Sequence, residues 1–96
     1  MSIHEIQAER IRGDLLELLR HETPVADDTL HSALRHLKGR AASPDQVKAA
    51  LRWLERQGLV TIEAFDELLS ATITGTGLSW LAREIYLDGI VRRSAG

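Results

Sequence analysis

The residues with the clearest chemical potential are three basic side chains, Lys48, Arg52 and Arg56, which follow one another at intervals of four. On an α-helix this spacing places them along one side, because one turn takes 3.6 residues. Such a row can contact DNA phosphates, and an arginine can also donate two hydrogen bonds to a guanine base. The alternative is an ordinary solvated helix face, with the arginine charges offset by Asp45 and Glu55.

The distribution of charge distinguishes this region from the rest of the chain. The net charge is -2 over 96 residues, which by itself does not indicate a nucleic-acid partner. A phosphate responds to the local field, however, and six of the twelve Lys and Arg residues lie between residues 25 and 58. The segments on either side are net acidic. The positive charge is therefore concentrated around the basic row.

Residue patterns typical of catalysis or metal binding are missing. The sequence has no cysteine, which excludes disulfides, thiolate metal ligands and cysteine nucleophiles. His31 and His36 are five residues apart, so they would point to different sides of a helix. Asp66 and Glu67 fall in a turn, where solvated carboxylates are not tuned for acid–base work. We expect a protein that is not an enzyme and needs no metal or cofactor.

Helical periodicity predicts a first helix over about residues 3–21. Its apolar positions recur every three or four residues and turn polar residues such as Asp14 away from the core. The helix ends before Pro24, because the residue preceding a proline avoids the helical conformation. Val25 and Ala26 can add one short extended piece.

A second helix is predicted over about residues 28–38 and a third over about 44–57, joined by a short turn that starts at Gly39. Glycine favours the left-handed conformation that ends a helix. Ser43 is a good N-cap, and the proline after it suits the first helical position. The apolar positions of both helices repeat at helical spacing: Leu30, Leu34, Leu37, Val47, Ala50, Leu51 and Leu54.

Two segments of alternating polarity between residues 59 and 74 predict an antiparallel β-hairpin. Asp66 and Glu67 lie between them, and neither is the glycine or asparagine that a two-residue turn prefers, so we expect a loop of about four residues. A last helix is predicted over about residues 76–87. Its core side would consist of Leu78, Leu81, Ala82 and Ile85.

The predicted fold is mainly α with a small antiparallel β-hairpin, in the order α-α-α-β-β-α. The two central helices and their short turn form a helix-turn-helix over about residues 28–57, and the hairpin over about 59–74 is placed as a wing. We interpret residues 1–96 as a single winged helix-turn-helix domain. With neither a signal peptide nor an apolar run of membrane length, we expect a cytoplasmic protein with no membrane contact.

Three motifs resemble the winged-helix regulators of the ArsR-like and MarR-like classes. The resemblance lies in the recognition helix, in the junction to the wing and in the start of the final helix: Ser43-Pro44-Asp45-Gln46-Val47 with Ala50-Leu51-Arg52-Trp53-Leu54, then Gln57-Gly58-Leu59-Val60, then Ile73-Thr74-Gly75-Thr76-Gly77. The wing tip is acidic, whereas DNA-binding wings usually carry Arg or Lys. ArsR-like metal sensors also use cysteine ligands, so metal sensing is not implied here.

Nearly the whole chain also resembles small uncharacterised proteins of Mu-like phages and prophages. These share the helical start, the junction and a tail like Gly89-Ile90-Val91-Arg92-Arg93. This resemblance implies a genomic setting without a defined activity.

These observations predict a phage or prophage transcriptional regulator that binds double-stranded DNA. The third helix would enter the major groove, and the predicted contacts are Lys38, Arg40, Ser43, Gln46, Lys48, Arg52 and Arg56. The alternative is a winged-helix module that binds a phage or host protein instead of DNA, since fold alone does not fix function. The acidic wing tip and the net charge support that alternative.

The last predicted helix carries more apolar surface than one core needs. We predict a homodimer through the first and last helices, with Trp80, Tyr86, Leu87 and Ile90 at the interface. The alternative is that these side chains pack onto the first helix and complete the core. We also expect Trp53 to pack against the wing.

Overall fold

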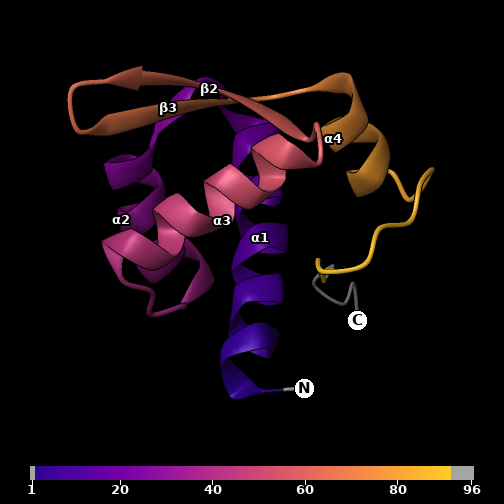
Figure 1. Ribbon diagram of the computed structural model, residues 1–96, viewed down its shortest axis with the longest axis horizontal. Helices are drawn as coiled ribbons and strands as arrows, with labels where there is room; N and C mark the ends of the chain where they lie inside the picture. The colour runs from indigo at the N-terminus through magenta and orange to yellow at the C-terminus, as the bar shows by residue number, and fades with distance from the viewer. Residues whose placement is uncertain (1, 92–96) are drawn as a thin grey trace.

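The computed structural model describes residues 2–91. Its elements are α1 (Ile3–His21), β1 (Val25–Ala26), α2 (Asp27–Lys38), α3 (Pro44–Arg56), β2 (Val60–Phe65), β3 (Leu68–Ile73) and α4 (Gly75–Leu81). α3 crosses in front of α1, and the sheet lies across one end of both helices (Figure 1). Arg92 and Arg93 of the predicted tail motif lie outside the described residues.

The three strands form an antiparallel sheet in the order β1-β3-β2. Val25 and Ala26, expected as a short extended piece, provide its third strand by pairing with Ala71 and Ser70. The wing is therefore tied to the segment that leads from α1 into α2. Within residues 2–91, no helix has the length and hydrophobicity needed to cross a membrane.

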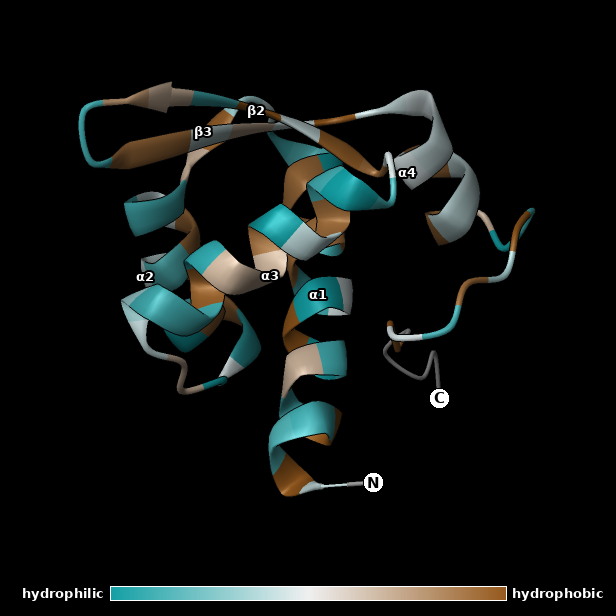
Figure 2. Cartoon of the chain, in the orientation of Figure 1, coloured by the Kyte–Doolittle hydropathy of each residue, from teal (hydrophilic) through white to brown (hydrophobic). Residues whose placement is uncertain are grey.

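The hydrophobic core fills the space between α1, α2, α3 and the sheet, and Figure 2 shows hydrophilic and hydrophobic residues alternating along these helices. The predicted apolar faces of α2 and α3 are buried with one exception. Leu37 is 74% exposed, because the last turn of α2 presents Lys38 to α1, where it pairs with Glu17. The buried residues of this core cluster are Ile11, Leu15, Leu16, Leu19, Leu30, Leu34, Val47, Ala50, Leu51, Leu54, Leu59, Val60, Ala71, Trp80 and Ile90.

The turn of the wing has two residues, Asp66 and Glu67, rather than the predicted loop of about four. Phe65 pairs directly with Leu68 on either side of it. Asp66 adopts a φ of 52°, in the left-handed region that aspartate tolerates better than most residues with a side chain. The tight turn therefore forms without glycine.

The C-terminal part of the fold corrects the prediction of a helix to about residue 87. α4 ends at Leu81, and Arg83 then takes a φ of 64°, which interrupts the helix. The chain returns along α1, where the Val91 amide donates to the Glu9 carbonyl at 3.2 Å. Leu78, expected on the core side, is 46% exposed because the short helix turns Trp80 inward instead.

Two of the four predicted dimer residues belong to the core of this chain. Trp80 is 1% exposed and Ile90 is 8% exposed. They pack with buried residues of α1 and α3 in one cluster. Trp80 and Ile90 therefore complete the core, as the alternative interpretation had it, and are not available to a partner surface.

The returning segment, residues 82–91, is held by a contact that also involves α3. The Arg12 guanidinium lies over the Trp53 ring, 4.3 Å from its centroid, and donates to the Gly89 carbonyl at 2.6 Å. Gly89 has a φ of 89°, and a Cβ there would lie 2.7 Å from the Trp53 ring. Trp53 thus packs against Arg12 and Gly89, not against the wing as predicted. Burial lowers the pKa of Arg12.

Gly13 provides a test of this docking. A Cβ at Gly13 would lie 1.9 Å from the Val91 carbonyl oxygen. We expect Gly13→Ala to push the returning segment off α1 and to lower the free energy of unfolding by about 1–3 kcal/mol, as overpacking does. Urea denaturation measures the change. The matched control is Gly75→Ala, where the new methyl group meets nothing within 4 Å. Equal stability of the two variants would contradict the prediction.

Candidate nucleic-acid interface

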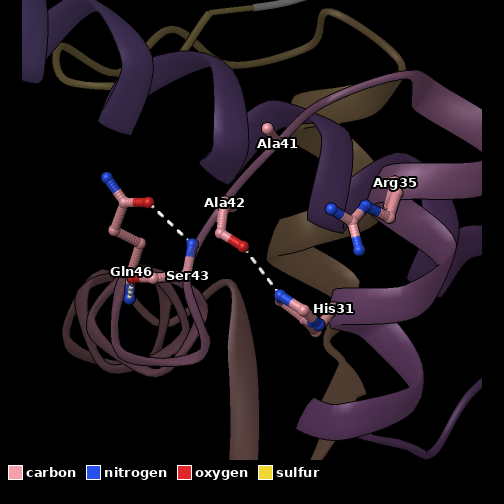
Figure 3. Close-up of a pocket in the computed structure, with 6 residues that line it drawn as sticks. All are labelled: His31, Arg35, Ala41, Ala42, Ser43 and Gln46. Atoms are coloured by element: carbon pink, nitrogen blue, oxygen red, sulfur yellow. Dashed lines mark hydrogen bonds between the residues drawn. The ribbon is translucent and has the colours of Figure 1, made fainter.

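The start of α3 is fixed by a reciprocal pair of hydrogen bonds between Ser43 and Gln46. The Gln46 amide donates to Ser43 Oγ at 3.1 Å, and the Ser43 amide donates to Gln46 Oε1 at 2.8 Å. The Ser43 hydroxyl oxygen therefore caps the N-terminus of α3. The side-chain NH2 group of Gln46 points away from the cap and keeps both of its donors (Figure 3).

The outward side of α3 has the predicted composition. Asp45, Ala49, Arg52 and Arg56 are all exposed, opposite the buried apolar face. The Arg52 guanidinium lies 3.0 Å from the Glu55 carboxylate, with both side chains more than a third exposed. Such surface pairs contribute roughly 0.2–1 kcal/mol, so Arg52 can exchange its partner at small cost.

Lys38 and Arg40, predicted to contact the DNA backbone, are instead paired with α1. Arg40 Nε lies 2.5 Å from Asp14 Oδ2, and Lys38 Nζ lies 3.0 Å from Glu17 Oε2. Asp14 was expected to face solvent, yet it is 2% exposed. A buried carboxylate requires a charged or hydrogen-bonding partner, and Arg40 provides one. Both cations therefore anchor the turn of the helix-turn-helix to α1.

Lys48 also has a structural role that the sequence did not reveal. Its ammonium group donates to the Glu67 carbonyl at 2.9 Å and lies 3.7 Å from the Asp27 carboxylate. Asp27 is 4% exposed, and its other carboxylate oxygen accepts the Leu69 amide at 3.1 Å. Lys48 thus links α3 to the wing and to the start of α2.

Two cations of the helix-turn-helix, Arg35 and Arg56, have no carboxylate within 4 Å among residues 2–91. Both are exposed. Arg35 was not among the predicted contacts, whereas Lys38 and Arg40 were, and the sequence offers no way to tell which of the three is free. Which of the three faces α1 depends on how α2 packs. The cations available to a ligand are therefore Arg35, Arg52 and Arg56, with Lys48 held beside the wing.

Comparisons with known proteins establish the fold. No protein-family model matches the chain, and no curated protein matches it. The structure of the hsRosR-S1 complex is similar, with a TM-score of 0.67 and 18% identity over 76% of this chain and 65% of that chain. The hsRosR-S4 complex has a TM-score of 0.62 and 19% identity, over 80% and 73%. The chain thus spans a little under two thirds of the first of these. This likeness confirms the winged helix-turn-helix fold.

The role of Arg40 can be separated from DNA contact by measuring stability. We expect Arg40→Ala to lower the free energy of unfolding by roughly 2–4 kcal/mol, because it removes the cation paired with the buried Asp14 carboxylate. Arg56→Ala is the control and should change stability by less than about 0.5 kcal/mol, since Arg56 is exposed and unpaired within the described part of the chain. Chemical denaturation checks both. A neutral Arg40→Ala would show that the ion pair is not structural.

Proposed function

We propose that this protein binds double-stranded DNA and regulates transcription, with α3 lying in the major groove. One observation carries the proposal: Arg52 and Arg56 lie on the exposed side of the second helix of a helix-turn-helix, the helix that reads base edges in such folds. Neither arginine is needed by the core. Each can therefore contact a phosphate or pair with O6 and N7 of a guanine.

The electrostatics support a binder with few backbone contacts. Lys38 and Arg40 pair with α1, and Lys48 is partly neutralised by Asp27. Within the helix-turn-helix, this leaves three arginines for phosphates. The logarithm of affinity falls with the logarithm of salt concentration by about 0.9 per phosphate neutralised. We therefore expect a slope of roughly -2 to -3 for each bound protomer. That is shallower than for a protomer with six or more phosphate contacts.

The resemblance to proteins of Mu-like phages and prophages supports a phage or prophage regulator. The duplex upstream of the protein's own coding sequence is the first probe for the operator.

Arg52 provides the main test of DNA binding. We expect Arg52→Ala to leave stability nearly unchanged and to weaken operator binding. A lost base contact would cost roughly 1–3 kcal/mol and relax specificity at one position, whereas a lost phosphate contact would weaken all sequences alike. A mobility-shift assay at two salt concentrations measures both effects.

Glu55→Ala is the matched variant, because it removes the carboxylate that holds Arg52 and should tighten binding. The proposal fails if the wild-type protein shows no salt-dependent binding to any duplex.

A protein-binding function is the second candidate, and the wing tip favours it. Phe65 and Leu68 are 57% and 42% exposed and pair across the turn formed by Asp66 and Glu67. An exposed apolar pair beside two carboxylates is suited to a protein surface and repels phosphates. If the wing approaches DNA, Asp66→Lys should tighten binding to all duplexes. If the wing binds a protein, Phe65→Ser should abolish that interaction and leave DNA affinity unchanged.

The homodimer stays part of the proposal with a smaller interface than predicted. Tyr86 is 78% exposed and Leu87 is partly exposed, whereas Trp80 and Ile90 are buried. Ile3 at the start of α1 and Val91 are also exposed apolar side chains, at 75% and 40%. Light scattering at micromolar concentration should show a dimer that Tyr86→Asp dissociates. A wild-type monomer would remove this part of the proposal.

A further inference from the structure

A cavity of about 290 Å³ lies at the turn of the helix-turn-helix, between α2 and α3. Figure 3 shows Arg35 on one side of the turn and Gln46 on the other, with the backbone of Ala42 and Ser43 between them. The lining residues are His31, Arg35, Ala41, Ala42, Ser43 and Gln46, and none of them is acidic. The chain has a net charge of -2, but the cavity is lined by the positive side chain of Arg35 and by no carboxylate.

The hydrogen-bond acceptors and donors of this cavity differ in whether they have partners. Three of its oxygens already accept hydrogen bonds: His31 Nε2 lies 2.7 Å from the Ala42 carbonyl, the Gln46 amide donates to Ser43 Oγ, and the Ser43 amide donates to Gln46 Oε1. Because a carbonyl only accepts, the His31 Nε2 carries the proton in that bond. Three donor groups of the cavity have no hydrogen-bond partner among residues 2–91: the Arg35 guanidinium, the Gln46 NH2 group and the Ser43 hydroxyl hydrogen.

Three oxygens of the cavity already accept hydrogen bonds and three donor groups are available, which favours a ligand rich in acceptors. A phosphate group fits this requirement, because it carries negative charge and several acceptor oxygens, and arginine binds it with a planar pair of donors. In a helix-turn-helix the first helix crosses the DNA backbone, so α2 is the element that brings Arg35 to a phosphate.

We propose that this cavity binds one phosphate of the DNA backbone, through Arg35 and the Gln46 NH2 group. The His31 side chain is a positioning residue, since its bond to Ala42 holds the turn between the two donors. This proposal rests on the DNA-binding function proposed above. It assigns the flanking backbone contact to Arg35 instead of Lys38 and Arg40, whose charges are used by α1.

Gln46→Glu is an informative variant, because glutamate at this position preserves the capping box while it replaces the outward NH2 group with an anionic oxygen. Stability should be retained, and affinity for every duplex should fall. Arg35→Ala should also weaken all sequences alike and flatten the salt slope by about one unit. Arg10→Ala is the control, since it removes the same charge from an exposed position on α1.

The measurements are duplex affinity at several salt concentrations and the Gln46 side-chain amide resonances during titration with inorganic phosphate or duplex. We expect both titrants to shift these resonances, and Arg35→Ala to abolish both shifts. If the wild-type protein binds duplex DNA but Arg35→Ala has the same duplex affinity as Arg10→Ala, this inference is overturned and the DNA-binding function is not. Shifts with inorganic phosphate but not with duplex would assign the cavity to a free phosphorylated ligand and overturn the DNA contact. Absence of duplex binding by the wild type would overturn the DNA-binding function itself.

Discussion

The pairing of Arg40 with the buried carboxylate of Asp14 sets how the helix-turn-helix sits on the rest of the chain. Asp14 lies in a run of buried residues on α1, where an unpaired charge would cost several kcal/mol. Arg40 comes directly after Gly39, whose φ of 62° ends α2 and directs the next residue back towards α1. The turn between α2 and α3 is thereby fixed, and with it the angle at which α3 presents its exposed side.

A second buried carboxylate fixes the wing in a similar way. Asp27 begins α2, and its side chain accepts the Leu69 amide of β3 while Lys48 of α3 lies beside it. Because β1 immediately precedes Asp27 and pairs with β3, the wing is held both by backbone pairing and by this side chain. The wing is therefore linked directly to α3 and to the start of α2. Together with Glu17, which pairs with Lys38, these two carboxylates explain why a central region rich in basic residues offers few free cations.

Periodicity and capping signals were sufficient to predict the helices and the hairpin. The bounds of α1 agree with the prediction, and α2 and α3 differ by one residue at one end each, because Ser43, Pro44 and Gly39 are local signals that do not depend on packing. The end of α4 was missed, since no glycine or proline marks residue 82 and the helix stops only where Arg83 turns left-handed.

The candidate site was predicted less well for a physical reason. Whether a basic side chain is free depends on the carboxylates that other elements bring to it, and these are distant in sequence. Asp14 is 26 residues from Arg40, and Asp27 is 21 residues from Lys48. The exposed side of α3 could be derived from the helical period alone, so Arg52 and Arg56 were placed correctly on the surface.

The small number of free cations has a consequence for specificity if the protein binds DNA as proposed. Contacts with phosphates supply most of the affinity for non-specific sequence, and each of them strengthens binding to operator and competitor DNA alike. Lys38, Arg40 and Lys48 are paired within the fold. This pairing would lower the affinity for non-specific DNA without weakening base readout by Arg52 or Arg56. The acidic wing acts in the same direction, because Asp66 and Glu67 repel the backbone of any duplex. The ratio of specific to non-specific affinity is the quantity that matters in a genome full of competing sites. An acidic chain with a few well-placed arginines can therefore discriminate between sequences even though its total affinity is modest.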